Sequence, residues 1–372
     1  MLRPGWLFYC VLLVRVLPVS AQFIYGQCSV GGTYGDGVFF EYNIRTGQFR
    51  EVHHCGINFC SGPGKSLVAL PPDYLFGTTT IGGMGSEGDI FRLETGSGYY
   101  YSLQSLNQSN GRLPYGGLMR ASNGMLYGMT TSGGDYDLGT LFLYDPVGLF
   151  FDRLYSFNGS EGRSPESTVC EGPDGKLYGT TGYGGNRNTG GTFCFDPLTG
   201  SYSVLHHFEP PSGAAPLCGP MYQDGSIWGL CYTGGQFGLG VLYRYDINSS
   251  NYRVEFSFDR INGAFPTSPL IPAGVNEIYG ITSQGGLYDQ GAIFRYSTAH
   301  GIYQKLHDFE GNNGDLPMGP LLVASDGQLY GTTQLSGTHG YGTLFRFNPD
   351  SLGFEVLLTL TDTMAFIPRE AS

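Results

Sequence analysis

The sequence predicts an all-β fold, a seven-bladed β-propeller with four-stranded antiparallel blades, from three markers that recur in register. An apolar residue, an aromatic and a glycine recur seven times, with consecutive glycines 51, 51, 51, 50, 51 and 51 residues apart. A glycine pair follows five and six positions later in six units, and a proline lies 37 positions after each anchor glycine. A period of about 50 residues is typical of propellers and other arrays. The anchor triplets are Ile24-Tyr25-Gly26, Leu75-Phe76-Gly77, Leu126-Tyr127-Gly128, Leu177-Tyr178-Gly179, Ile227-Trp228-Gly229, Ile278-Tyr279-Gly280 and Leu329-Tyr330-Gly331.

Each unit is expected to form four strands, because turn residues divide it at regular points. After the proline Pro317, residues 321–324 form a short apolar run, and Ser325-Asp326-Gly327 has turn chemistry. The next strands are expected at residues 328–332, 342–347 and 354–360. No segment keeps a 3.6-residue apolar period, so no helix is expected. Four antiparallel strands per unit make one propeller blade.

The N-terminal residues 1–21 have the organisation of a secretory signal peptide. Arg3 supplies a positive start, residues 6–14 are an apolar core too short to span a bilayer, and Val19-Ser20-Ala21 is a small-residue cleavage site. Arg15 departs from this pattern, so the alternative is that the segment is not cleaved and remains as an anchor. Cleavage after Ala21 would leave residues 22–372 as a single propeller domain.

The sequence allows two ways of closing the ring, because the first strand of the first blade would fall inside the signal peptide. The chain ends four residues after Pro368, the last marker proline. Either residues 363–372 lie against the first blade as a partial clasp, or that blade has three strands.

Charge and sequons favour a secreted protein or one in the lumen of the secretory pathway. The net charge of −12 disfavours nucleic acid and anionic lipid surfaces as partners, and no stretch after the leader is apolar enough for membrane insertion. N-glycosylation is expected at three sequons, which begin at Asn107, Asn158 and Asn248.

The eight cysteines predict at most a few disulfides and no metal site. Cys55 and Cys60 are spaced to close a small loop. Cys218 and Cys231 flank a turn and would face each other across a hairpin, so a disulfide is possible there too. The other strand cysteines are expected to be small buried side chains: Cys28, Cys170 and Cys194. No zinc-type spacing occurs.

The sequence contains no motif for a hydrolase, a nucleotide or a redox cofactor. Four of the seven histidines repeat in the expected fourth strands, which indicates a structural role: His53, His54, His206 and His307. We therefore expect no cofactor and look for a site among the residues that depart from the repeat.

One group of departures is apolar and aromatic. Three units carry threonine directly after the anchor glycine, whereas the others carry Gln27, Met129, Leu230 and Ile281. Together with Trp228, the three apolar members are expected to form a hydrocarbon wall at one face of the ring. Aromatic residues crowd the loops around the glycine pairs and either pack between blades or form a cup around a funnel: Tyr136, Tyr232, Phe237 and Tyr288, with Tyr34, Tyr183 and Tyr341.

A second group is charged or polar and would face the central channel. Arg120 and Glu171 occupy equivalent positions in adjacent innermost strands. They either form an ion pair between blades, or Arg120 donates a hydrogen bond to a ligand oxygen. Lys65, Tyr115 and Glu166 follow the marker prolines and are placed to line the same funnel.

The repeat unit, clearest in residues 177–200, runs Leu-Tyr-Gly-Thr-Thr, then a glycine pair, then Gly-Thr-Phe and Asp-Pro-Leu-Thr-Gly. It resembles the GloVer tandem repeat, a kelch-like propeller unit, over essentially the whole mature chain. Among secreted proteins of this kind, the chain resembles the fungal hetero-Diels–Alderases, which join a tropolone-type ortho-quinone methide to a humulene-type sesquiterpene alkene. That resemblance implies a cofactor-independent pericyclase of secondary metabolism, acting on small apolar or aromatic molecules, and it transfers no site residue.

A cycloaddition needs two partners held in reactive geometry and a donor for the oxygen that gathers charge. From their positions, we expect the catalytic donors to be Arg120, Gln27 and Tyr115, and the substrate-binding residues to be those of the apolar and aromatic group. The alternative is a non-catalytic carbohydrate-binding propeller, whose rim aromatics stack on sugar rings. A lectin is expected to repeat its site, whereas these rim residues differ between units, which favours an enzyme.

Overall fold

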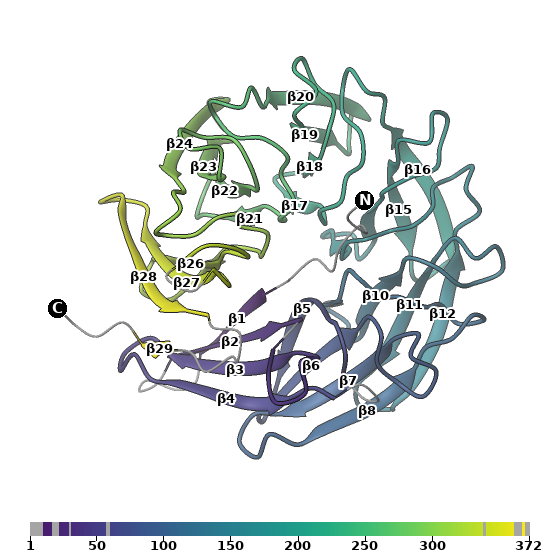
Figure 1. The fold of residues 1–372 in the computed structure, drawn as a ribbon. Coiled ribbons are helices and arrows are strands. Elements are labelled where there is room, and N and C mark those ends of the chain that lie inside the picture. The colour runs from purple at the N-terminus through teal and green to yellow at the C-terminus, as the bar shows by residue number, and fades with distance from the viewer. Residues whose placement is uncertain are drawn as a thin grey trace, which may run out of the picture.

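The computed structural model describes residues 10–16, 22–29, 31–56, 60–337, 340–360 and 367–368, and describes residues 10–16, 22, 63 and 367–368 by their backbone alone. Seven antiparallel sheets are arranged in a ring, with the first strand of each sheet nearest the axis and the fourth on the outside (Figure 1). The predicted seven-bladed propeller with four-stranded blades is confirmed, with one extra short strand at the outer edge of blade seven.

The strands of the blades follow one another in chain order. Blades one and two contain β1 (Cys10–Val16), β2 (Gln22–Cys28), β3 (Val38–Asn43), β4 (Phe49–His54), β5 (Pro63–Leu70), β6 (Tyr74–Thr79), β7 (Asp89–Glu94) and β8 (Tyr100–Ser105). Blades three and four contain β9 (Leu118–Arg120), β10 (Leu126–Thr130), β11 (Thr140–Asp145), β12 (Phe150–Ser156), β13 (Cys170–Glu171), β14 (Leu177–Thr181), β15 (Gly191–Asp196) and β16 (Ser201–His207). Blades five and six contain β17 (Met221–Gln223), β18 (Ser226–Cys231), β19 (Val241–Asp246), β20 (Asn251–Ser257), β21 (Ile271–Pro272), β22 (Glu277–Thr282), β23 (Ala292–Ser297) and β24 (Ile302–Asp308). Blade seven contains β25 (Leu322–Val323), β26 (Leu329–Thr332), β27 (Thr343–Asn348), β28 (Gly353–Thr359) and β29 (Ile367–Pro368).

Blade one has a complete innermost strand, which neither closure scheme anticipated. Strand β1 lies within the expected signal peptide, and all seven of its residues pair with β2. Strand β29 pairs with β28 on the outer edge of blade seven and not with blade one. The partial clasp is therefore wrong for residues 367–368. Blade one has four strands in the full chain, and the three-stranded alternative, which applies after cleavage at Ala21, stays a prediction. The other residues of 363–372 lie outside the described part of the chain.

Side-chain packing between neighbouring blades forms the core and closes the ring. Ile24 and Phe40 of blade one lie in one buried cluster with Tyr330 and Leu358 of blade seven. Equivalent clusters lie between the other neighbouring blades. Each blade therefore buries both of its sheet faces against its neighbours, as expected for repeats that cannot fold alone.

The anchor glycine makes room for an aromatic ring on the third strand. A Cβ added at Gly128 would lie 2.4 Å from the ring of Phe142, its cross-strand partner. The same aromatic marks a register shift between the third and fourth strands in every blade, for example between Leu141 and Phe142. The glycine pairs are required for a different reason, because their backbone adopts positive φ: Gly133 and Gly134 have φ of 84° and 79°.

The outermost strands are joined by stacked aromatic rings. Tyr155 of blade three stacks on Tyr202 of blade four, with ring centroids 4.1 Å apart, and Phe256 stacks on Tyr303 at 3.8 Å. Histidine occupies this position in other blades, where His307 stacks on Phe354. The predicted structural role is confirmed for His53, His206 and His307, which all stack on a ring of the next blade.

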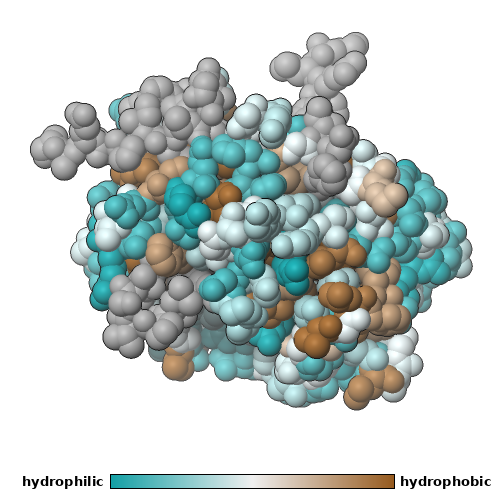
Figure 2. All heavy atoms as spheres, turned by 90° about the horizontal axis from the view of Figure 1, so that it is seen from below, coloured by the Kyte–Doolittle hydropathy of each residue, from teal (hydrophilic) through white to brown (hydrophobic). Residues whose placement is uncertain are grey.

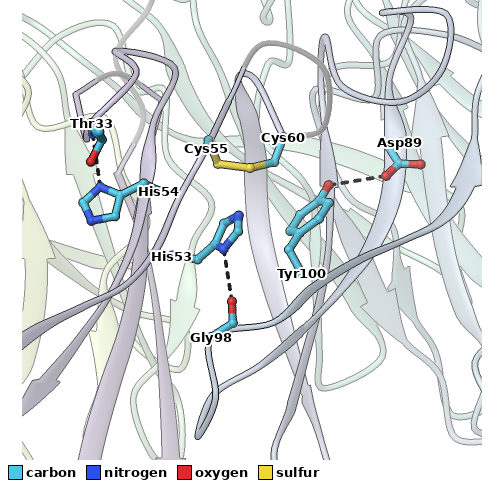
Figure 3. The surroundings of a disulfide bond; sticks show 8 residues. All are labelled: Thr33, His53, His54, Cys55, Cys60, Asp89, Gly98 and Tyr100. Carbon is cyan, nitrogen blue, oxygen red and sulfur yellow. Dashed lines mark hydrogen bonds between the residues drawn. A yellow bond between two sulfur atoms is a disulfide. The ribbon is translucent and has the colours of Figure 1, made fainter.

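The disulfide predicted from the C-x4-C spacing is present between Cys55 and Cys60, next to His53 and Tyr100 (Figure 3). Cys218 and Cys231 are both free thiols, although the β17–β18 register, in which Met221 pairs with Trp228, places them at opposed positions. In the part of the chain that is described, there is no helix long and apolar enough to cross a lipid bilayer. The surface seen from below shows small hydrophobic groups among hydrophilic residues (Figure 2).

Candidate functional site: a pocket on the propeller axis

A pocket of about 160 Å³ lies where the innermost strands begin. Six blades contribute to its wall, each with residues that lie one to four positions after its marker proline. In most units the residue 39 positions after the anchor glycine has a small side chain, and this leaves the space on the axis open. The lining residues are Lys65, Ser66, Leu67, Gly116, Ser167, Thr168, Leu217, Cys218, Gly219, Thr267, Pro269, Met318, Gly319 and Pro320.

Lys65 is the one charged side chain among these lining residues. Its Nζ reaches past blade three and donates a hydrogen bond to the backbone carbonyl of Glu166, which precedes β13 of blade four, 3.2 Å away. Gly116 holds the equivalent position in the intervening blade and presents no side chain there. The structure thus confirms that Lys65 lines the funnel, while the neighbours of Tyr115 and Glu166, not these two side chains, form the wall.

Burial dominates the electrostatics of this amine. The residue keeps some surface in the pocket, yet protein surrounds its amine, and this desolvation lowers the pKa of Lys65. Glu166, Cys218 and Tyr115 act in the opposite direction and favour the ammonium form. Burial also raises the pKa of the Cys218 thiol to about 12, so that this thiol is neutral and weakly nucleophilic at pH 7.

Thr267 supplies a second polar group to the wall. The residue is 8% exposed, and its Oγ1 has no hydrogen-bond partner in the described part of the chain. Buried hydroxyl groups are usually paired, so an unpartnered one in a pocket wall is placed to bind a ligand. The remaining wall is largely apolar, which suits a small ring carrying one or two oxygen atoms.

The three predicted donors do not come together. Arg120 ends β9 and is exposed, and its partner Leu126 begins β10, so it lies at the opposite end of the channel from the pocket. Glu171 accepts hydrogen bonds from the backbone N and Oγ of Ser122, both at 2.7 Å. Among the described residues, the expected ion pair between Arg120 and Glu171 is not formed.

The other two donors lie at the pocket end but outside its wall. Gln27 is fully buried, and its Nε2 donates to the carbonyl oxygen of Gly64 in the next blade. Tyr115 is 37% exposed and directly precedes the lining residue Gly116. Neither side chain lines the described pocket.

The position of Gln27 serves contacts between blades. Thr78 and Thr180, its equivalents, donate to the carbonyl oxygens of Pro114 and Pro216, the marker prolines of the following blades. The apolar equivalents and the neighbouring tryptophan are fully buried in clusters between blades: Met129, Leu230, Ile281 and Trp228. Their burial corrects the expectation of a hydrocarbon wall on the funnel, because no solvent-facing surface remains to contact a substrate.

The predicted aromatic rim is partly present. The loops that follow the second strands lie at the pocket end, since Pro63 at the start of β5 pairs with Thr79 at the end of β6. In these loops, Tyr136 is 61% and Tyr288 is 52% exposed, and Phe237 is similarly exposed. Tyr232 instead packs against Phe265, with ring centroids 5.1 Å apart. Six of the seven aromatic residues expected around the funnel are therefore exposed: Tyr34, Tyr136, Tyr183, Phe237, Tyr288 and Tyr341.

The sequons occupy turns on both ends of the ring. Asn107 lies in a turn at the pocket end, and Asn248 lies in the β19–β20 hairpin at the other end; both are exposed. Asn158 is half-buried, and its side-chain nitrogen donates to Glu161.

Sequence reasoning missed Thr267, which is unremarkable taken alone, and considered Cys218 only as a disulfide partner, although both line the pocket. The pocket could have been found by comparing the residues that stand 38 and 39 positions after the anchor glycine in each unit. At the second of these, Lys65 stands among Gly116, Ser167, Cys218, Ser268 and Gly319.

This fold and this pocket define a tandem-repeat β-propeller with an axial cavity of small-molecule size. The chain belongs to the Gloeobacter/Verrucomicrobia repeat family, whose family model matches residues 15–170, 74–275 and 169–372. The sequence has no significant match among curated proteins.

Solved structures share the fold at low sequence identity. A putative 6-phosphogluconolactonase from Bacteroides uniformis is 13% identical, with a TM-score of 0.58 over 89% of this chain and 94% of that one. A fungal alcohol oxidase in complex with copper is 14% identical, with a TM-score of 0.55 over 81% and 66%. An oligogalacturonate lyase in complex with manganese is 11% identical, with a TM-score of 0.51 over 94% and 85%. These likenesses support the propeller architecture alone.

Proposed function

We propose that the protein is a cofactor-independent pericyclase that couples a heterodiene carrying a carbonyl group to an alkene, with the axial pocket as its site. The supporting observation is a single amine, that of Lys65, in a wall otherwise built from apolar and uncharged residues. In a hetero-Diels–Alder reaction, the carbonyl oxygen of the heterodiene gathers negative charge in the transition state. A donor fixed beside that oxygen lowers the barrier.

The volume of the pocket limits how the partners are held. A cavity of about 150 Å³ accommodates a benzene-sized ring, so the 160 Å³ pocket accommodates one ring of an ortho-quinone methide. The alkene partner, a humulene-type hydrocarbon, then approaches from the mouth, on the side of the exposed aromatics Tyr136 and Tyr288. Lys65 donates to the carbonyl oxygen, and Thr267 is placed to donate a second hydrogen bond.

The test compares product formation from a quinone methide precursor and an alkene with and without the protein, without added metal, flavin or nucleotide. Stereoselectivity is the main readout, because such partners also couple without a catalyst. Replacing Lys65 with methionine is expected to lower the catalysed rate by about 10²-fold, the typical effect of removing one preorganised donor. Arg120→Met, which removes a charge at the other end of the channel, is the matched control and should leave rate and selectivity unchanged. A product mixture that is the same with and without protein would remove the enzyme proposal.

A carbohydrate-binding function is the second candidate, and a repeated feature supports it. Four loops carry an exposed aromatic residue eight positions after the anchor glycine: Tyr34, Tyr136, Phe237 and Tyr288. Repetition at one position of the blade is what a lectin with several equivalent sites would need, since aromatic faces stack on sugar rings. Glycan-array binding that is lost in Tyr136→Ala and Tyr288→Ala, but kept in Lys65→Met, would favour this function over the pericyclase.

A further inference from the structure

The environment of Lys65 differs from that of the other lysines in the chain. The sequence contains three lysines. Lys176, in the β13–β14 turn, and Lys305, on the outermost strand β24, both lie outside the pocket. Their Nζ atoms pair with the carboxylates of Asp174 and Asp308, at 3.4 and 2.8 Å. The amine of Lys65 has a backbone carbonyl at hydrogen-bond distance and a cavity beside it.

We propose that Lys65 is a reactive amine that condenses reversibly with a small aromatic aldehyde or ketone bound in the axial pocket, forming a Schiff base. This inference goes beyond the cycloaddition and does not rest on it. The neutral amine has one lone pair, and donating an N–H to the carbonyl oxygen of Glu166 does not use it. A ring of benzene size fits the cavity beside the amine.

The atoms of this step balance without an oxidant or a reductant. The nitrogen lone pair attacks the carbonyl carbon, and a proton moves from nitrogen to oxygen to give a carbinolamine. The oxygen then leaves as water with the second nitrogen-bound proton, and a C=N bond remains. Thr267 is placed to hydrogen-bond the departing oxygen, because its buried Oγ1 has no partner in the described residues and its side chain lines the same cavity.

Desolvation supports the nucleophilic form. Burial lowers the pKa of Lys65, against the opposing effects of Glu166, Cys218 and Tyr115, which are the titratable groups acting on it. A lowered pKa enlarges the fraction of neutral amine at pH 7, by about tenfold for each unit. Desolvated lysines in apolar pockets are used in this way for covalent catalysis.

The experiment traps the Schiff base in the full-length protein. Benzaldehyde is added at pH 7 with a borohydride reductant, which delivers hydride to the imine carbon, and the modified peptides are quantified by mass spectrometry. We expect modification at Lys65 to exceed that at Lys176 or Lys305 by about tenfold or more. The other two lysines are internal controls, and the α-amine of the chain terminus is mapped separately.

Two comparisons locate the reaction in the pocket. A pyrene aldehyde, which is too large for the cavity, should modify Lys65 no faster than the other two lysines. Lys65→Met removes the amine but keeps a side chain of similar length, so the major adduct should vanish while the unfolding temperature stays unchanged. Mapping in the unsubstituted protein decides the question even where that variant fails to fold. Adducts spread evenly over the three lysines, or equal reaction of Lys65 with both aldehydes, would overturn the proposal.

Discussion

The imidazole of His206 stacks face to face on the phenol ring of Tyr252 in the next blade, with ring centroids 3.8 Å apart and planes 4° apart. Burial within this stack lowers the pKa of His206 to about 4, with a further contribution from His207. The folded propeller therefore favours the neutral imidazole of His206, and protonation of this ring destabilises the fold.

We predict that His206→Phe removes part of the acid sensitivity of the fold. The pKa of His206 is lower in the folded state than the value of 6.5 expected on unfolding, so stability is lost as the pH falls from 6.5 towards 4. Because the ring is partly exposed, we expect the variant to be more stable by only about 1 kcal/mol at pH 5, and unchanged at pH 8. Phenylalanine is suitable because Phe256 fills the equivalent position in blade five. Denaturant unfolding at both pH values measures the effect, and His300→Phe, at an exposed histidine, is the control.

Asp89 is predicted to destabilise the fold at neutral and alkaline pH. It is fully buried at the start of β7, where it accepts hydrogen bonds from Ser102 Oγ at 2.9 Å and from the hydroxyl of Tyr100 at 3.3 Å (Figure 3). Burial raises the pKa of Asp89 to about 7, despite these hydrogen bonds. Since the folded-state pKa lies above the unfolded value, stability is full below about pH 4 and falls as the pH rises to 7.

Asp89→Asn should therefore raise the free energy of unfolding at pH 8 by roughly 2 kcal/mol and leave it nearly unchanged at pH 4. Asp152→Asn, at an exposed aspartate of β12, is expected to have no comparable effect. An Asp89→Asn variant that is less stable at pH 8 would show that the carboxylate is needed for the fold and would contradict this prediction.

The anchor glycine is predicted to be intolerant of any side chain. A Cβ at Gly77 would lie 2.6 Å from the ring of Phe91 and 3.1 Å from Leu67. Gly77→Ala is expected to cost about 1–3 kcal/mol through overpacking, with a matching fall in unfolding temperature. Gly96→Ala in the same blade meets nothing within 4 Å and is the control. If the two variants unfold alike, the ring of Phe91 does not determine the choice of glycine.

Processing and glycosylation remain predictions from the sequence. We expect cleavage after Ala21 and glycans on at least Asn107 and Asn158, with occupancy highest at the exposed Asn107. Intact mass before and after glycosidase treatment of protein secreted from a eukaryotic host measures both. Cleavage would remove β1, which pairs with β2 along its whole length. Retention of residues 10–16 in the secreted protein would contradict the signal-peptide assignment and support β1 as a permanent part of blade one.

The sequence predicts the ring well because its markers carry local geometric requirements. The glycine pair needs positive φ, as at Gly133, and the turn residues fix where strands end. The pocket could not be predicted in the same way, because its wall combines residues of six blades around an axis that no single repeat defines. Residues that depart from the repeat were a sound place to search, yet Met129 and Gln27 depart from it to adjust contacts between blades. Burial in the assembled ring separates these two causes of departure, and it is not visible in the sequence.

The packing of Ile24 and Phe40 against Tyr330 and Leu358 also sets the order of events during synthesis. The first blade leaves the ribosome long before the last one exists, and until then one sheet face at each end of the growing arc has no neighbour. At 5–20 residues per second, the interval is on the order of half a minute. The incomplete ring therefore needs protection from aggregation for longer than a protein of the same length with local contacts. Both unpaired sheet faces are covered only when the last blade has been translated and has folded.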